Sequence, residues 1–144
     1  MIQEALILKI TIKGKPKPLK RHFHRKDGRN FDPSYKDKKD IIFKTAQFKP
    51  KQPLKGGLRV YMTFYMPRPK SHFRTGKFKN QLRGNIALYH TTTPDIDNLI
   101  KLIFDSFNEI FWEDDKQICQ LQSEKMYCDI GEKPRTEIII EGAD

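Results

Sequence analysis

Two aspartates stand two positions apart where a helix is predicted to begin. Asp95 and Asp97 lie in the run TPDIDNL. In extended backbone, side chains at positions i and i+2 point the same way, so these two carboxylates would converge on one point. Converging carboxylates repel each other unless a cation lies between them, and hard oxygen ligands suit Mg²⁺ or Mn²⁺. A structural interpretation is also open, because Asp97 as the N-cap would gain from the helix dipole.

Further charged residues follow in the same stretch. Lys101 lies four residues after Asp97, on the same helical face. There it would either neutralise a phosphate oxygen or a leaving group, or form a weak surface ion pair. Asp114 and Asp115 form a second acidic pair in a predicted turn, a setting that aspartate favours for structural reasons alone. Taken singly, none of these patterns decides between chemistry and structure.

Together, the order and spacing of these residues resemble the RusA family of crossover-junction endodeoxyribonucleases. The shared pattern is an Asp-x-Asp-Asn-Leu-x-Lys run, a helix, an aromatic residue with paired aspartates, and a later lysine. Its members are Asp95, Asp97, Asn98, Leu99, Lys101, Trp112, Asp114, Asp115, Ile118 and Lys125. The basic run GKPKPLKR after the first predicted strand is a further similarity. One departure is Thr93, where the family often has a basic residue; it affects one phosphate contact and not the metal site.

The resemblance implies a role for each matching residue. Asp95, Asp97 and Asp115 are the expected metal-binding catalytic carboxylates, with Mg²⁺ as the cofactor and Mn²⁺ as the alternative metal. Lys101 is the expected essential basic residue beside them, and Asp114 is a weaker candidate. The family also implies a homodimer with an α+β fold that cuts two strands of a four-way DNA junction symmetrically, in recombination and repair of branched DNA, often in a prophage.

Periodic apolar residues predict one α+β domain spanning residues 1–144, with a mixed β-sheet packed against two main helices. Strands are expected at 5–13, 58–66, 117–127 and 135–141, and helices at 34–48, with Ser34 as a cap, and at 94–110. The long segment 67–93 reads as a functional or partly disordered loop. A chain of 144 residues is enough for one core but not for two.

The position of Asp115 poses a geometric problem. A straight helix over residues 97–110 is about 20 Å long, and Asp115 follows its far end. One metal site needs all its ligands within a few ångströms. Either the helix ends early and the turn folds back towards Asp95, or Asp115 reaches the site of a second subunit, which would tie catalysis to dimerisation. The sequence does not choose between these arrangements.

Charge divides the chain into a basic and an acidic part. The net charge is +10, but residues 1–90 contribute 23 Lys and Arg against 5 Asp and Glu, whereas residues 91–144 contribute 5 against 13. The basic part predicts a phosphate-binding surface with salt-sensitive, sequence-blind affinity, although a merely solvated surface is the alternative. The candidate DNA contacts are Lys15, Lys17, Lys20, Arg21, Arg68, Lys70, Arg74, Lys77 and Lys125.

Phe73 and Phe78 lie within the second basic loop. Aromatic side chains among basic residues can stack on exposed bases at a branch point. The sequence therefore suggests a loop that enters the centre of a DNA junction. The alternative is that both phenylalanines pack beneath the loop.

Several functional classes are not expected. Cys119 and Cys128 lack a partner cluster, which favours reduced thiols over a disulfide or a zinc site. The histidines at 22, 24, 72 and 90 have no metal-ligand spacing. No apolar run approaches the roughly 20 residues of a membrane span, and the N-terminus does not resemble a signal peptide. We expect a cytoplasmic protein that does not bind membranes.

Two alternatives to a nuclease are kept. A non-catalytic, basic nucleic-acid-binding protein explains the positive part, but not an acidic cluster that repels phosphate in the absence of a metal. A structural protein could instead pair its acidic part with the basic part of a neighbour, and its oligomers would then dissociate at high salt.

Overall fold

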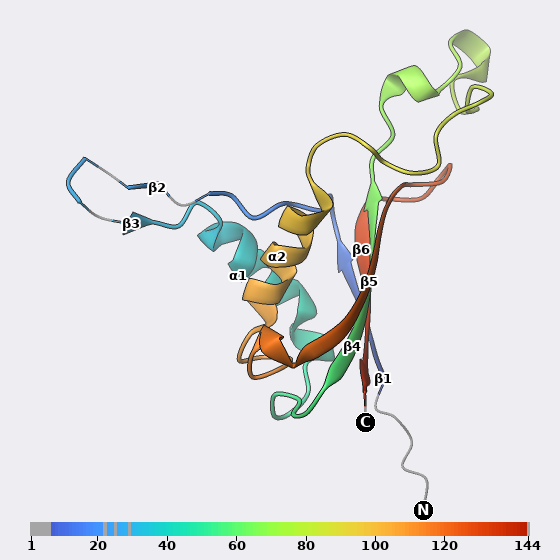
Figure 1. Cartoon of the computed structure of the whole chain (residues 1–144). Coiled ribbons are helices and arrows are strands. Elements are labelled where there is room, and N and C mark those ends of the chain that lie inside the picture. Colours follow the sequence, from blue (N-terminus) through green and yellow to red (C-terminus); the bar gives the residue numbers. More distant parts are fainter. Residues whose placement is uncertain (1–6, 22, 25, 29, 144) are drawn as a thin grey trace, which may run out of the picture.

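The computed structural model describes residues 7–21, 23–24, 26–28 and 30–143. A four-stranded sheet forms one layer, and two helices on one of its faces form the second (Figure 1). The main elements are β1 (Ile7–Lys13), α1 (Tyr35–Thr45), β4 (Leu58–Met66), α2 (Ile96–Phe107), β5 (Ile118–Tyr127) and β6 (Arg135–Gly142). The short strands β2 (Phe23–His24) and β3 (Asn30–Phe31) form a separate ribbon. The predicted α+β fold, a mixed sheet with two main helices, is confirmed.

The sheet is mixed because one strand pair is parallel. The strand order is β1-β6-β4-β5, with β6 antiparallel to β1 and β4, and β5 parallel to β4. Parallel strands need a crossover connection, and here the crossover contains α2. α2 therefore runs opposite to β5, with its N-terminus near the end of that strand and its C-terminus near the start (Figure 1).

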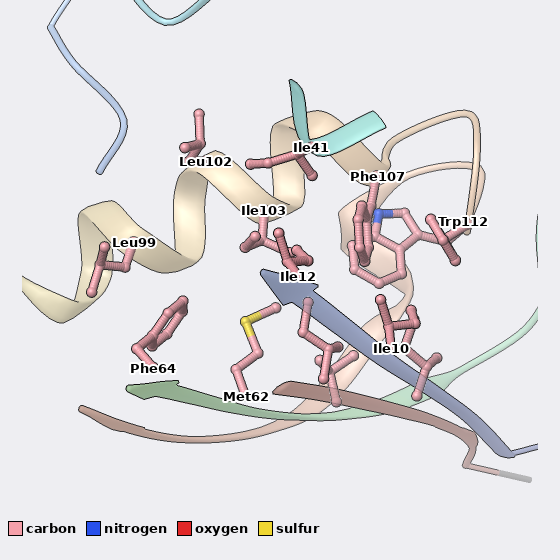
Figure 2. Packing of buried hydrophobic residues seen from close by; sticks show 14 of the residues in the cluster. Ile10, Ile12, Ile41, Met62, Phe64, Leu99, Leu102, Ile103, Phe107 and Trp112 are labelled. Atoms are coloured by element: carbon pink, nitrogen blue, oxygen red, sulfur yellow. The ribbon is translucent and has the colours of Figure 1, made fainter. Parts of the chain in front are cut away.

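The core lies between the sheet and the helices. In β4, alternate residues from Leu58 to Met66 are buried and face the helices, as the strand period requires. α2 contributes an apolar stripe with helical spacing (Figure 2), made of Leu99, Leu102, Ile103 and Phe107. None of the helices in the described chain is long and apolar enough to cross a membrane.

Residues 14–21, the basic segment that follows β1, are fixed against both helices. Ser34 stands at the N-cap of α1 as predicted, but its hydroxyl does not cap that helix within the described chain. Instead, Ser34 Oγ accepts a hydrogen bond from the Lys20 N–H at 2.8 Å. The Leu19 N–H donates to Asn98 O of α2 at 2.8 Å. These two bonds place the segment beside the start of α2.

Residues 67–93, which we call the arm, extend beyond the sheet (Figure 1, green to yellow). The arm contains two short 3-10 helices, η2 (Lys70–His72) and η3 (Gly76–Phe78). An antiparallel bridge joins Phe73 to Leu82. The sequence suggested a functional or partly disordered loop, and the hydrogen-bonded, hairpin-like structure disagrees with the second of these alternatives.

Candidate active site

Asp95 and Asp97 lie at the N-terminus of α2 in different roles. Asp95 is the N-cap residue with extended backbone, and Asp97 lies in the first helical turn. The prediction that Asp97 caps the helix is wrong, because the helix begins at Ile96. The Asp95 carboxylate makes no capping hydrogen bond within the described chain. Both side chains are exposed, so their oxygens are available to a ligand.

The two aspartates line one side of a surface hollow, which we call the carboxylate hollow. Its other walls are residues 89–93 at the end of the arm and residues 123–125 of β5. Glu124 adds a third acidic side chain to this lining. Sequence analysis missed Glu124, because its approach to α2 depends on the parallel pairing of β5 with β4, which no local pattern reveals.

Lys125 holds the turn that precedes Asp95. Its Nζ donates hydrogen bonds to Thr92 O at 2.5 Å and to Pro94 O at 2.6 Å. The Thr93–Pro94 peptide bond is cis. We predicted Lys125 as a DNA contact, but the structure uses its ammonium to fix backbone beside Asp95.

His90 is a further residue at this turn. Its Nε2 lies 3.3 Å from Thr92 Oγ1, and its Nδ1 is buried without a hydrogen-bond partner among the described residues. Burial, and then the nearby charges of Lys125 and Lys15, lower the pKa of His90 from its ordinary value of 6.5. His90 was not a predicted site residue, since a single histidine in a loop gives no spacing signal. Of the other histidines, His22 lies outside the described residues.

Lys101 lies beside Asp97, as the helical spacing predicted. Its Nζ is 3.6 Å from Asp97 Oδ2, and the two side chains are 58% and 64% exposed. An ion pair this exposed is weak, because solvent screens the attraction. Lys101 can therefore exchange the carboxylate for a phosphate oxygen at little cost.

Asp115 lies at the opposite end of α2. The helix continues to Phe107, and Glu109 with a φ of 69° then helps to reverse the chain. Asp115 begins the 3-10 helix η4 (Asp115–Gln117), immediately before β5. Ile118 and Glu124 are separated by about 20 Å, given a rise of about 3.3 Å per strand residue. Within one chain the structure therefore does not bring Asp115 to Asp95 and Asp97, and the turn does not fold back.

Asp114, next to Asp115, has a structural role. Its side chain accepts a hydrogen bond from the Lys116 N–H at 2.8 Å. Gln117 Oε1 in turn accepts hydrogen bonds from the backbone N–H groups of Glu113 and Asp114. These contacts form a capping box, the turn chemistry that the sequence offered as its alternative interpretation.

Metal ligation at the hollow is incomplete within one chain. Among the described residues, no group of three or more His, Cys, Asp and Glu side chains is arranged to hold a metal ion. Asp95 and Asp97 are nevertheless a suitable partial set, since Mg²⁺ often binds through one or two carboxylates and takes its other ligands from water and substrate phosphates. The donor set thus fits Mg²⁺ or Mn²⁺ if phosphate or a second chain completes it.

A basic groove continues from the hollow. Lys15, Lys17 and Lys20 line it together with Thr93 and Asp95. Lys17 and Lys20 form ion pairs with Asp37 at 3.2 and 4.0 Å. Three of the predicted DNA contacts are therefore next to Asp95, and Arg21 follows them as an exposed residue.

The predicted DNA contacts of the arm line neither the carboxylate hollow nor the basic groove. Arg68 Nε donates to Cys128 O at 2.7 Å and Arg68 Nη1 donates to Ala87 O at 3.1 Å, so this residue fixes the base of the arm. Lys70, Arg74 and Lys77 are exposed further out.

The family model of endodeoxyribonuclease RusA matches residues 12–141. The chain belongs to the RusA endodeoxyribonuclease family. Nucleases of this family generally depend on a divalent metal. The chain is also 31% identical, over 103 residues, to the uncharacterized protein YqaN of Bacillus subtilis (strain 168), and the match covers 72% of this chain and 70% of YqaN.

Proposed function

We propose that this RusA-family chain is a metal-dependent, structure-specific endonuclease that resolves four-way DNA junctions or other branched DNA by phosphodiester hydrolysis, in recombination and repair. The observation that supports this proposal most is a pair of exposed carboxylates at the end of a basic groove. Such carboxylates repel DNA phosphates unless a cation neutralises them. The surrounding lysines attract the same phosphates and would guide the backbone to the carboxylates.

Each residue of the site has a part in this chemistry. Asp95 and Asp97 would hold the divalent cation, which lowers the pKa of water and stabilises developing charge on phosphate when bound. Lys101 would neutralise a phosphate oxygen or the leaving group. Lys125 keeps the turn before Asp95 in position. Positioning of this kind matters because misplacement of a reacting group by about 1 Å costs on the order of a hundredfold in rate.

The free part of the β5 edge supports the homodimer. The arm covers one end of this edge, where the His90 N–H donates to Lys125 O at 2.9 Å and the Tyr127 N–H donates to Leu88 O at 3.0 Å. Among the described residues, no strand pairs with the outer edge over residues 118–124. An unpaired strand edge is a template for another strand.

The free segment has the geometry for pairing with itself. Because Lys125 and Tyr127 direct their backbone groups outwards, the alternate residues Leu121 and Ser123 do the same, up to the register irregularity at Cys119. If two copies of β5 paired antiparallel about a two-fold axis at Leu121, the outward N–H and C=O groups of one strand would therefore face those of the other. Leu121, which is 39% exposed, would be buried at that axis.

This pairing would complete the site. It would place the partner's Ile118 opposite Glu124, and the partner subunit's Asp115, three residues earlier in that chain, would then lie near the carboxylate hollow. Asp115 would then act in trans, which is the second arrangement that the sequence left open. Two sites related by the axis would also suit symmetric cutting of two strands.

The first experiment compares a labelled four-way junction with a linear duplex of matched sequence, in Mg²⁺, in Mn²⁺ and in EDTA. We expect paired symmetric nicks on the junction alone, lost in EDTA and in Asp97→Asn. Tight junction binding with no cleavage in either metal would overturn the proposal. It would favour the non-catalytic binding protein, with which the incomplete ligand set of one chain also agrees.

A mixing experiment tests whether Asp115 acts in trans. Asp97→Asn and Asp115→Asn chains are each expected to be inactive alone. In a mixed dimer, one site would combine the intact Asp97 of one chain with the intact Asp115 of the other, so the mixture should regain about a quarter of wild-type nicking. No recovery after verified subunit exchange would show that Asp115 does not complete the site of a second chain.

The interface itself is tested with Leu121→Lys. A charged side chain at a strand edge prevents further pairing, and Leu121 is part-exposed, so the monomer should stay folded. We expect a monomer by light scattering, with little cleavage. If the variant subunits still associate as tightly as wild type, the interface lies elsewhere.

A further inference from the structure

The arm carries positive charge without any negative charge. Between residues 67 and 93 there is no Asp or Glu, and the six basic residues are Arg68, Lys70, Arg74, Lys77, Lys79 and Arg83. The arm projects past the end of the sheet, away from the body formed by the sheet and helices (Figure 1). A basic element of this kind attracts nucleic acid before other partners of a DNA nuclease.

Internal hydrogen bonds give the arm a defined shape. The Arg83 N–H donates to His72 O at 2.9 Å and the Arg74 N–H donates to Gln81 O at 2.8 Å, on either side of the Phe73–Leu82 bridge. Beyond these bonds the chain turns through η3. We call residues 74–81 the arm tip.

The base of the arm is packed against the strand that borders the carboxylate hollow. The Tyr127 ring contacts the His72 ring at a centroid distance of 4.8 Å, the His90 ring at 4.9 Å and the Arg68 guanidinium at 5.2 Å. His90 in turn lies beside the turn that Lys125 holds. The arm tip is therefore held at a set position relative to Asp95, rather than hanging from a loose loop.

The two phenylalanines of the arm have different environments. Phe73 is half-buried in the bridge with Leu82, where it holds the arm together. Phe78 lies at the tip and is 38% exposed. The Arg74 guanidinium is 4.3 Å and the Lys77 ammonium 5.2 Å from the centroid of its ring. An exposed aromatic ring beside two cations offers a surface for a base together with charges for the adjoining phosphates.

We propose that the arm tip binds an unpaired base of branched DNA, with Phe78 stacking on the base and Arg74 and Lys77 contacting the adjoining phosphates. This inference rests on the proposed function, which makes branched DNA the substrate. Stacking of a base on an aromatic side chain tolerates any sequence but needs an accessible base face. Linear duplex offers no such face along its length, so Phe78 would distinguish a branch from paired DNA.

The experiment uses 2-aminopurine, a base whose fluorescence responds to stacking. It is placed in a mismatch, and is therefore unpaired, at the branch point of a four-way junction, and at a paired position of a matched linear duplex. Full-length protein is titrated in EDTA, so that no strand is cut. The variants are Phe78→Ala, Phe78→Trp, which keeps an aromatic ring, and Phe43→Ala, which removes another exposed phenylalanine on α1, 82% exposed.

We expect the wild type, Phe78→Trp and Phe43→Ala to change the fluorescence of the unpaired probe. Phe78→Ala should not, and it should bind the branched DNA about tenfold more weakly, with unchanged affinity for the duplex. Arg74→Gln should reduce the salt dependence of binding by about one ion. Equal fluorescence changes and affinities for Phe78→Ala and wild type would overturn the inference. So would an equal loss of affinity for the branched and the linear DNA.

The outcome separates this inference from the proposed function. Binding in EDTA needs no hydrolysis. If the protein cuts no DNA in Mg²⁺ or Mn²⁺ but Phe78→Ala still weakens binding to branched DNA, only the nuclease proposal is overturned. Normal junction cleavage with no Phe78 effect on binding would overturn only the role of the arm tip.

Discussion

A pair of acidic residues lies near each end of α2, and the structure treats the two pairs differently. At the N-terminus, Asp95 stands at the cap position without using its side chain as a cap, and Asp97 is paired only loosely with Lys101. At the C-terminal end, Asp114 is fixed in a capping box. A carboxylate that leaves a capping opportunity unused, in a surface hollow, is a better candidate for chemistry than one whose oxygens already stabilise a turn.

Among the substitutions that test this comparison of the two acidic pairs, Lys125→Met should have the largest effect on cleavage. The substitution keeps most of the side-chain volume but removes the hydrogen bonds to Thr92 O and Pro94 O. We expect cleavage to fall by about a hundredfold, because the turn before Asp95 loses its support. Junction affinity in EDTA should change little. A large loss of affinity with an unchanged turnover would instead mean that Lys125 contacts DNA, as the sequence suggested.

Asp114→Ala removes the N-cap side chain of η4 without touching the carboxylate hollow. The free energy of unfolding should fall by about 1 kcal/mol, the usual cost of losing an N-cap side chain. Nicking per folded protein should stay near the wild-type level, whereas Asp115→Asn should lose it. Denaturant unfolding and a junction assay on the same preparations measure both quantities. Equal loss of cleavage in the two variants would place both aspartates in the site.

His90→Gln is expected to have the smallest effect, on the pH dependence of stability. The pKa of His90 is lowered in the folded protein, so the unfolded chain binds a proton more readily. The stability from neutral His90 is therefore present above about pH 6.5 and is lost as the pH falls towards the lower folded pKa. The variant should lose stability less steeply than wild type in that window, as followed by thermal unfolding. Parallel profiles would show that other groups govern it.

Local sequence patterns predict most of the fold. Alternation placed a strand at 58–66, which is the observed β4, and a helix was correctly expected after Pro94. The helix was predicted to reach 110 but ends at Phe107, because Asn108 leaves helical geometry and Glu109 takes a positive φ. The first strand was expected from residue 5 and is seen from Ile7, with the preceding residues outside the described part.

The candidate site was less predictable where it depends on distant contacts. Asp95, Asp97 and Lys101 are close in sequence, so helical spacing alone brings them together. Lys125, His90 and Glu124 join them only because β5 pairs parallel to β4 and the arm returns along its edge. Arg68 reads as a phosphate contact from charge, yet its hydrogen bonds to Cys128 O and Ala87 O are decided by tertiary packing.

The parallel pairing of β4 and β5 also has a consequence for folding kinetics. Leu58 pairs with Ile118, and the arm, α2 and both acidic pairs all belong to the chain between them. Closing so long a connection costs entropy before the ladder compensates for it, so this pair should form late on the folding pathway. Until it forms, Lys125 is not held beside the turn before Asp95, and a partly folded chain would lack the assembled carboxylate hollow.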